Sequence, residues 1–527
     1  MGTRKTIQTQ VLIIGAGATG TGVMRDLALR GVHCALVDRS DVNAGASGGN
    51  HGLLHSGGRY VSNDAHAAAE CREEGDILKK LAPQCVDKTG GYFSAVAGDD
   101  ENFIADFKSH CEKCGIDCTE VDPAEAREQE PHLAEDTIAV YEVPDASVDP
   151  FKLSLENVAH AKLVNSSKYL RHTEVVRFEI ENGRIRAAIC RDTDSGEELR
   201  IEAEQYVNAA GAWAASVAAQ AGASVDMLYS RGTLLVTQER LSSRVINRLR
   251  PPSDGDILVP GGTVSILGTT SVRVDDPADA RPTVEEVDRN VEQGWPMMPI
   301  LAHTRYIRAY AGVRPLVLVG DGEGDGRSVS RDFSLFDHED ANLSNFCTIT
   351  GGKLTTYRVM AERCSDLVAS RLGVSAPCLT ATEPLATVNA CEWTEPGRAP
   401  KIWARNPDAD DPILCECEMV PASAIDEIMN DCSEFIPDPG LQALGLRSRI
   451  GKGSCQGSFC GMRIAAHLYD TGRFDSPDGL KNMQGFFSQR FKGLRPVLWE
   501  TQLVQAELAE ALHCGLLGLE QIEGEDD

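Results

Sequence analysis

The segment 11–38 carries the pattern that most limits how this chain can fold. Residues 11–14 form a short apolar run, as in a strand buried on both faces of a parallel sheet. The glycine-rich sequence GAGATG follows at 15–20, and then a helical segment that Gly31 ends. A second apolar run, 34–37, closes on Asp38. This order predicts a parallel β-α-β unit with a tight glycine turn between its first strand and its helix.

The three glycines of this turn have different physical tasks. Gly15 permits the tight turn, Gly17 lets the backbone approach a pyrophosphate, and Gly20 lets the helix pack closely on the strand. The helix N-terminus adds free N–H groups and a positive dipole end, which favour phosphate. We expect Asp38 to accept hydrogen bonds from the adenosine ribose of a bound dinucleotide.

Two later segments again combine a strand with glycines, and they help to identify the nucleotide. They are 206–213 (YVNAAGAW) and 349–355 (ITGGKLT). With the early turn, they resemble FAD-dependent oxidoreductases of the D-amino-acid-oxidase type, so we expect FAD rather than NAD. The resemblance implies an α/β fold in which a Rossmann-like FAD-binding domain is interleaved with an α+β substrate domain. The residues expected to hold FAD are Gly15, Gly17, Ala18, Thr19, Gly20, Asp38, Arg39, Ser47, Asn50, Gly52, Leu53, Gly211, Gly352, Leu354 and Thr355.

Cationic side chains on glycine-rich loops predict an anionic substrate. Arg59, Arg314 and Lys353 each follow glycines closely in the sequence. Arginine offers a planar pair of donors to phosphate or carboxylate, and lysine offers a point charge. Cations gathered near a flavin need a reason in a chain whose net charge is −28. Structural salt bridges remain the alternative for each residue taken alone.

Short stretches along nearly the whole chain resemble the large catalytic subunits of the anaerobic, quinone-linked glycerol-3-phosphate dehydrogenases. These stretches are 13–20, 49–57, 148–151, 256–261, 268–271, 312–316 and 350–354. The resemblance implies that sn-glycerol 3-phosphate is oxidised to dihydroxyacetone phosphate by hydride transfer from C2 to N5 of FAD. It also implies substrate contacts from Arg59, Tyr60, Thr270, Arg314 and Lys353.

The same resemblance assigns catalytic roles to His55, Arg59, Arg314 and Lys353. A histidine can take the C2 hydroxyl proton near neutral pH, because its unperturbed pKa is about 6.5. His51 is a second candidate for this base. A cation near the developing alkoxide would stabilise it. Two other functions stay open: a related FAD-dependent amino-acid or hydroxy-acid dehydrogenase, and an electron-transfer subunit without a substrate site.

Four cysteines in the C-terminal part follow the pattern C-x-C…C-x4-C, and they are Cys415, Cys417, Cys455 and Cys460. Four thiolates suit a [2Fe-2S] cluster or zinc, but structural zinc sites usually have two to four residues between paired cysteines. The pattern resembles the bacterioferritin-associated-ferredoxin-like domain. That resemblance implies a [2Fe-2S] cluster, which would pass electrons to partner subunits and then to quinone. Zinc and four free thiols remain alternatives.

These features predict four segments. Residues 1–375 form the oxidoreductase, 376–412 a linker rich in Pro, Ala, Thr and Asp, 413–467 a small helical [2Fe-2S] module, and 468–527 a helical tail. The tail carries basic and aromatic residues that we expect on a solvated or subunit-facing surface: Phe487, Arg490, Phe491, Lys492 and Arg495.

The charge of the chain excludes nucleic-acid binding as its main task. Asp and Glu number 79 against 51 Lys and Arg, and a field of that sign repels phosphate backbones. Only 14 of the basic residues are lysine, a composition that resembles proteins of salt-loving microbes. No run of 18 apolar residues predicts a membrane span. The resemblance implies a cytoplasmic protein held at the inner face of the cell membrane through partner subunits.

Overall fold

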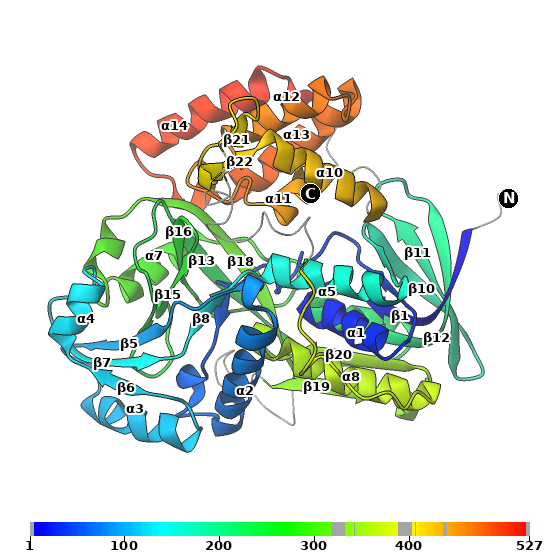
Figure 1. Cartoon of the computed structure of the whole chain (residues 1–527), viewed down its shortest axis with the longest axis horizontal. Helices are drawn as coiled ribbons and strands as arrows, with labels where there is room; N and C mark the ends of the chain where they lie inside the picture. The colour runs from blue at the N-terminus through cyan, green and yellow to red at the C-terminus, as the bar shows by residue number, and fades with distance from the viewer. Residues whose placement is uncertain are drawn as a thin grey trace.

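The structure is a computed structural model that describes residues 5–317, 332–341, 343–387, 403–405, 407–435 and 440–522. Two β-rich parts lie side by side, and a helical part formed by the end of the chain lies across them (Figure 1). The strands of the two large sheets alternate along the sequence, so the chain passes between the two β-rich parts more than once. This confirms the predicted α/β fold with interleaved domains.

The first large sheet contains the predicted β-α-β unit. Its order is β10-β11-β12-β1-β2-β9, and β20 pairs with both β12 and β19. Strands β9, β2, β1, β12 and β20 run parallel. The bounds are β1 (Lys5–Ile14), β2 (Cys34–Val37), β9 (Lys168–Leu170), β10 (Thr173–Glu181), β11 (Arg184–Asp192), β12 (Glu198–Asn208), β19 (Phe333–Asp337) and β20 (Phe346–Gly351).

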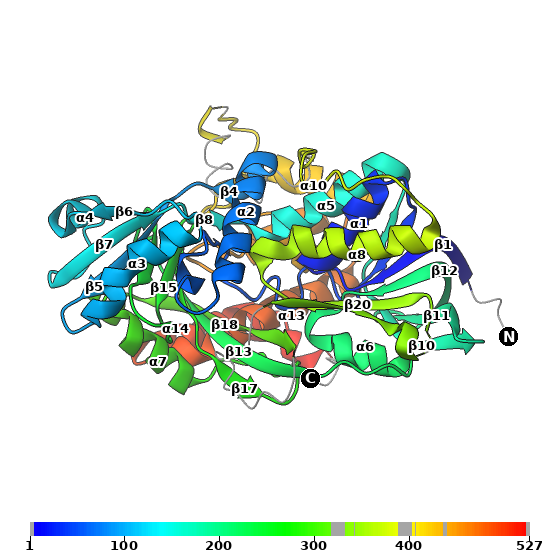
Figure 2. The same cartoon turned by 90° about the horizontal axis from the view of Figure 1, so that it is seen from below.

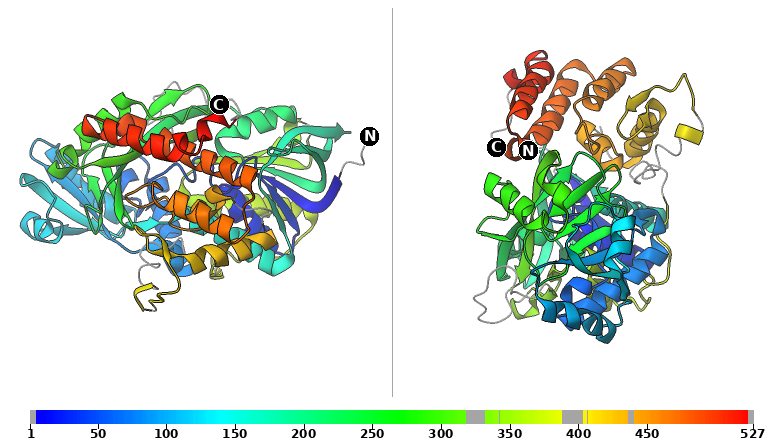
Figure 3. Two further views of the ribbon diagram at one scale, coloured as in Figure 1. Left: turned by 90° about the horizontal axis from the view of Figure 1, so that it is seen from above. Right: turned by 90° about the vertical axis from the view of Figure 1, so that its left-hand side faces the viewer.

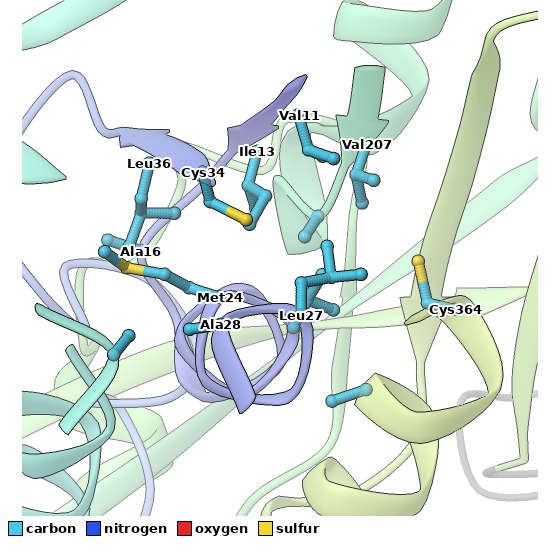
Figure 4. Close-up of a cluster of buried hydrophobic side chains, with 14 of the residues drawn as sticks. Val11, Ile13, Ala16, Met24, Leu27, Ala28, Cys34, Leu36, Val207 and Cys364 are labelled. Atoms are coloured by element: carbon cyan, nitrogen blue, oxygen red, sulfur yellow. The ribbon is translucent and has the colours of Figure 1, made fainter. Parts of the chain in front are cut away.

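Helices cover both faces of this sheet. Figure 2 shows α1 (Ala18–Leu29), α5 (Pro150–Asn165) and α8 (Tyr357–Leu372) on one face and α6 (Ala214–Gln220) on the other. Val11 and Ile13 of β1 pack against Leu27 of α1 on the first face (Figure 4). The alternate residues Leu12 and Ile14 belong to the core on the opposite face. Burial on both faces explains why β1 ends in an unbroken apolar run.

The second large sheet has the order β17-β13-β16-β15-β14-β5-β7-β6, and β18 pairs with β13. The long antiparallel pair β13–β18 places Gly232 opposite Gly312 and Ser230 opposite Arg314. The strands are β5 (Gly91–Val96), β6 (Thr119–Val121), β7 (Thr137–Val143), β13 (Met227–Thr237), β14 (Val245–Arg248), β15 (Ile257–Gly261), β16 (Val264–Gly268), β17 (Val272–Val274) and β18 (Tyr306–Val317).

Shorter elements complete this β-rich part. A small sheet has the order β3-β8-β4. The strands and helices are β3 (Leu53–Leu54), β4 (Val86–Asp87), β8 (Ala146–Val148), α2 (Ala65–Leu81), α3 (Glu101–Lys113), α4 (Pro123–Gln129) and α7 (Val284–Gly294). Helix α7 begins with a capping box in which Thr283 and Glu286 satisfy each other's backbone N–H groups.

The C-terminal part packs around one apolar core, which includes Ile425, Ile464 and Phe486. The boundary expected at residue 467 falls within this core, because α13 contributes to it. Its elements are β21 (Ile413–Cys415), β22 (Val420–Pro421), α10 (Ala422–Phe435), α11 (Leu441–Arg447), α12 (Cys460–Asp470), α13 (Ser476–Lys492) and α14 (Thr501–Glu510). Figure 3 shows α12, α13 and α14 lying over the rest of the chain. Among the described helices, none has the length and apolar character needed to cross a bilayer.

One expectation for the second half of the chain needs correction, and another falls partly outside the described residues. Phe487 is 2% exposed, so it does not belong to a surface patch, whereas Arg490 and Phe491 are partly exposed and Lys492 and Arg495 are exposed. Residues 388–402 and 406 of the expected linker lie outside the described residues. The described start of that segment packs on the oxidoreductase part, since Leu385 N–H donates to the Leu81 carbonyl at 2.8 Å.

Candidate active site

A cavity of about 730 Å³ lies where the two large sheets meet, and segments from both sheets line it. This volume falls in the range of small-molecule and cofactor sites. The predicted residues that line it are Gly15, Gly17, Ala18, Thr19, Asp38, Arg39, Ser47, Asn50, Leu53, His55, Arg59, Tyr60, Gly211, Thr270, Arg314, Gly352, Lys353, Leu354 and Thr355. The FAD and substrate predictions therefore converge on one site.

Gly20 and Gly52 were also predicted to bind FAD, but neither lines the cavity. A Cβ at Gly20 would overlap the carbonyl oxygen of Gly15, so glycine is needed for the helix to approach the strand. Gly52 has φ of +69°, and a Cβ there would lie 2.7 Å from the Val148 oxygen. Both residues shape the backbone around the cavity.

The glycine turn leaves room for a ligand next to the backbone. Gly15 has φ of +107°, and its Cβ would lie 2.5 Å from the Ala209 carbonyl oxygen. Gly17 differs, because a Cβ there would meet only the side chain of Ser47. The Ser47 hydroxyl accepts a hydrogen bond from Ala18 N–H at 3.0 Å, at the N-terminus of α1. This end of the helix suits the approach of a phosphate.

Asp38 stands at the end of β2, as the sequence predicts. Its carboxylate accepts hydrogen bonds from Ala16 N–H at 2.7 Å and from Ser40 N–H at 2.8 Å. Burial raises the pKa of Asp38. A carboxylate has about four acceptor positions, so these two bonds leave capacity for ribose hydroxyls.

Arg39 stacks on an aromatic ring that the sequence analysis missed. Its guanidinium lies 4.3 Å from the ring centroid of Trp213, and both residues line the cavity. Trp213 is the last residue of the second glycine segment, YVNAAGAW, so its place in that segment was the available signal. The Gly211 carbonyl in that segment accepts a hydrogen bond from the Thr350 hydroxyl at 3.0 Å.

Arg59 is fixed at the cavity wall by a buried carboxylate. Its Nη2 donates to Asp256 Oδ2 at 3.0 Å and to the Ser253 carbonyl at 3.2 Å. The Asp256 side chain has no exposure, and it also pairs with Arg250 at 2.6 Å. Asp256 therefore orients Arg59 and shares its single negative charge between two arginines.

Arg314 extends from β18 across a glycine of the neighbouring strand. Its Nη2 donates to the Thr269 hydroxyl, and its Nη1 donates to the Thr270 carbonyl at 3.2 Å. A Cβ on Gly232 of β13 would lie 2.6 Å from Cζ of Arg314. Sequence reasoning missed Thr269 and Gly232, although a glycine inside a strand often marks such a close approach.

Two side chains that were predicted to bind ligands make their hydrogen bonds to other groups of the protein. The Thr270 hydroxyl donates to Glu286 at 2.9 Å and accepts from Thr233 N–H at 2.9 Å. The Asn50 amide donates to the Ser47 carbonyl at 2.6 Å and accepts from Gly52 N–H at 2.7 Å. Thr270 thus positions Arg314 through its carbonyl, and Asn50 shapes the loop that lines the cavity.

The candidate bases and the third cation lie near one another. The rings of His51 and His55 are 6.2 Å apart between centroids, and those of His55 and Tyr60 are 5.5 Å apart. Lys353 Nζ lies 5.2 Å from the Tyr60 ring centroid. The backbone N–H of His55 donates a hydrogen bond to the Thr355 hydroxyl at 3.2 Å. Both imidazoles line the cavity and remain candidates for the base.

The four predicted cysteine ligands lie close together in the C-terminal part. The Cys460 thiol donates hydrogen bonds to Cys415 and Cys455, and the Cys417 thiol donates to Cys455. The Cys460 hydrogen bond is the largest cause that lowers the pKa of Cys455, to about 5. Within the described residues, no three His, Cys, Asp or Glu side chains surround a point that could hold one metal ion.

Comparisons with known proteins agree with this geometry. Residues 10–367 match the family "FAD dependent oxidoreductase". The A subunit of the anaerobic glycerol-3-phosphate dehydrogenase of Escherichia coli (strain K12) is 39% identical, and the match covers 99% of both chains. The A1 subunit of the enzyme of the same name from Haloferax volcanii is 37% identical over 97% of this chain and 91% of the relative.

Solved structures share the fold at low identity. The glycerol-3-phosphate dehydrogenase from Bacillus halodurans, complexed with FAD, has a TM-score of 0.63 at 21% identity and covers 94% of this chain and 96% of its own. Glycine oxidase from Bacillus cereus has a TM-score of 0.56 at 20% identity and covers 69% and 98%. The chain belongs to the FAD-dependent oxidoreductases and, among them, to the family of anaerobic glycerol-3-phosphate dehydrogenase A subunits.

Proposed function

We propose that this chain oxidises sn-glycerol 3-phosphate to dihydroxyacetone phosphate with FAD. The observation that carries the proposal is the meeting of Arg59, Arg314 and Lys353 in the cavity that also contains the glycine turn. These cations come from segments far apart in a chain of net charge −28, so their convergence favours an anionic substrate. The activity named for the full-length relatives supports the same substrate.

The residues of the cavity can share the work of this reaction. FAD, when bound, accepts the hydride that leaves C2. The arginines and Lys353 hold the phosphate and the reacting oxygens, and His55 or His51 takes the proton from the C2 hydroxyl as the C2–O double bond forms. A cation beside that oxygen stabilises its developing negative charge.

The test compares Arg314→Ala with Arg273→Ala, an exposed arginine of β17 in the same sheet. A hydrogen bond to a charged group contributes about 1.5–3 kcal/mol, so we expect kcat/KM to fall by roughly 10- to 150-fold in Arg314→Ala. The control should keep its activity, and both variants should stay yellow. Near wild-type activity in Arg314→Ala would show that this cation does not hold the substrate.

A substrate screen that measures dye reduction distinguishes the proposed activity from two alternative functions. In an amino-acid or hydroxy-acid dehydrogenase, the same cations would hold a carboxylate, and those substrates would reduce the dye. In an electron-transfer subunit, no substrate would reduce the bound flavin. Reduction by sn-glycerol 3-phosphate alone supports the proposed activity.

We also propose that Cys415, Cys417, Cys455 and Cys460 hold a [2Fe-2S] cluster. Such a cluster takes two cysteines on each of two irons, so it needs no group of three ligands around one ion. Structural zinc sites usually have two to four residues between paired cysteines, so the single residue between Cys415 and Cys417 fits zinc less well. Iron and acid-labile sulfide in the purified protein would support the cluster, and one zinc per chain would refute it.

We propose that residues 1–375 perform the oxidation and that the C-terminal module passes electrons to partner subunits and quinone at the inner face of the cell membrane. The relatives are named as A subunits, which supports partner chains. A run of exposed apolar residues at the C-terminal end offers a surface for such a chain: Trp499, Leu503, Val504, Leu508, Leu512 and Leu516. A complex isolated from the native host should dissociate in Leu508→Glu, and an intact complex would exclude this surface.

We further propose that the protein works in a salt-rich cytoplasm. The excess of carboxylates over basic residues supports this habitat, because high salt screens their mutual repulsion.

A further inference from the structure

Two partly buried arginines lie next to each other where the C-terminal module meets β18. Arg308 belongs to β18, and Arg490 belongs to α13. Nη2 of Arg308 donates to the Gln489 carbonyl at 3.4 Å, and Nη1 of Arg490 donates to the Gly451 carbonyl at 2.7 Å. Nε of each is buried without a hydrogen-bond partner. Among the described residues, neither arginine forms an ion pair with a carboxylate.

This pair of like charges is poorly compensated. Burial and then the charge of Arg308 lower the pKa of Arg490 to about 9, and burial also lowers the pKa of Arg308. Arg490 stays cationic at neutral pH, because a pKa of about 9 lies above 7. Carboxylates are abundant in this chain, yet none of those described neutralises this pair. A partly buried charge without a carboxylate partner is costly, which points to an anion that the polypeptide itself does not supply.

Other charges around the pair do not fill this role. Glu418 pairs with Arg449 at 3.1 Å. Asp149 is the largest favourable charge acting on Lys452, whose amino group is also buried nearby and without a hydrogen-bond partner. These two carboxylates therefore each serve another cation. The region carries an excess of positive charge in a strongly acidic protein.

The loop that Arg490 crosses carries one of the predicted cluster ligands and leads to another. Gly451, its hydrogen-bond partner, precedes Cys455 in this loop. A Cβ on Gly457, between Cys455 and Cys460, would lie 3.5 Å from Cδ of Arg490. The charge of Cys460 acts favourably on Arg490. Arg490 thus lies against the loop that carries Cys455 and leads to Cys460.

Arg308 also lies on the strand whose later residues line the cavity. From Arg308, β18 continues through Tyr310 to Arg314 at the cavity. The Tyr310 hydroxyl donates to the carbonyl of Asn50, which lines the cavity, at 2.8 Å. Ala309 N–H donates to the Gly493 carbonyl just after α13 at 2.7 Å. One strand therefore connects Arg314 at the cavity with the segment that follows α13.

We propose that Arg490, reinforced by Arg308, is the counter-charge of the [2Fe-2S] cluster and raises its reduction potential. The inference rests on the proposed cluster. When one electron leaves the reduced flavin for the cluster, the negative charge of the cluster grows by one. A fixed, partly buried cation stabilises the reduced form more than the oxidised form, and net charge is a known determinant of such potentials. By raising the reduction potential of the cluster, Arg490 favours electron transfer away from the flavin.

The test is a redox titration of the full-length protein, followed by the electron paramagnetic resonance signal of the reduced cluster. We expect Arg490→Met to lower the equilibrium constant for one-electron reduction at least tenfold, which is about 59 mV. Arg490→Lys keeps the charge and should stay near the wild-type potential. Arg463→Met is the matched control, because Arg463 is exposed, follows Cys460 closely and already pairs with Glu416 at 2.8 Å.

Each outcome decides the inference. An unchanged potential in Arg490→Met, or an equal shift in Arg463→Met, would overturn it. Loss of iron from Arg490→Met but not from Arg490→Lys would support it, because binding of the negatively charged cluster would then depend on a positive charge at this position. Loss of iron from both would indicate a packing role and overturn it. Wild-type protein without iron would overturn the cluster as well, while leaving glycerol 3-phosphate oxidation untouched.

Discussion

Replacing Gly232 with alanine should disable the active site without disturbing the fold. The new Cβ would lie 2.6 Å from Cζ and from Nη1 of Arg314, far inside the usual contact distance of about 3.5–4.0 Å. The atoms it meets are the far end of a flexible side chain, so the guanidinium can move while β13 and β18 stay paired. The expected displacement is therefore about 1 Å, away from the position set by Thr269 and Thr270.

A displacement of this size can cost about 100-fold in rate, which corresponds to about 2.7 kcal/mol of transition-state stabilisation. We expect Gly232→Ala to lose about that factor in kcat/KM for sn-glycerol 3-phosphate and to keep its FAD. Dye-linked kinetics and the visible flavin spectrum measure the two quantities. Gly261→Ala is the matched control, because a Cβ on this glycine of β15 in the same sheet would meet Ile266 at an ordinary 3.6 Å.

Wild-type kcat/KM in Gly232→Ala would refute the reasoning, since Arg314 would then act from another position or not at all. Loss of FAD or of stability in this variant, with Gly261→Ala unaffected, would also refute it. In that case Gly232 would support the fold rather than the placement of Arg314.

Three further predictions concern stability. Asp256→Ala removes a fully buried carboxylate that pairs with two partly exposed arginines, so urea unfolding should show a loss of about 1.5–3 kcal/mol, against less than about 1 kcal/mol for Glu181→Ala, which breaks an exposed pair. The melting temperature should rise with KCl concentration, because salt screens a net charge of −28; a flat or falling curve would contradict the proposed habitat. Burial lowers the pKa of Lys452 from 10.5 to about 8. Between pH 8 and 10.5 the unfolded chain therefore binds more protons at Lys452 than the folded chain does. The unfolding free energy of wild type, measured relative to Lys452→Met, should rise over this pH range. A difference that stays constant with pH would contradict this.

Local signals made the cofactor side of the cavity predictable from the sequence. The tasks of Gly15 and Gly20 depend on neighbouring backbone, and Asp38 ends the next strand of the same β-α-β unit. The cations were also predictable, because Arg314 and Lys353 occupy glycine-rich segments. Their convergence in one cavity follows from the interleaved sheets, which the resemblance implied.

Contacts between distant segments could not be predicted. Gly232 meets Arg314 only because β13 and β18 pair in one register, and Trp213 meets Arg39 across the cavity. Thr270 belongs to a matching motif, yet its hydroxyl bonds to the protein itself. The sequence shows that such residues are polar but not which partner takes each hydrogen bond.

The basic aromatic tail shows the same limit. Its composition predicted a surface, but α13 turns Phe487 into the core and places Arg490 beside the cysteine loop, while Lys492 points to solvent. One helix can present these residues to different surroundings, and only the packing of α13 decides which residue is buried. The four cysteines, in contrast, were predictable from their spacing, and the structure brings them together.

The most direct test of the account is anaerobic addition of sn-glycerol 3-phosphate to the purified yellow protein while its visible absorbance is recorded. A cavity that holds a phosphate with three cations beside FAD predicts rapid bleaching of the flavin and one dihydroxyacetone phosphate per flavin reduced. A flavin that stays oxidised with this substrate but is bleached by an amino acid or a hydroxy acid would contradict the central claim.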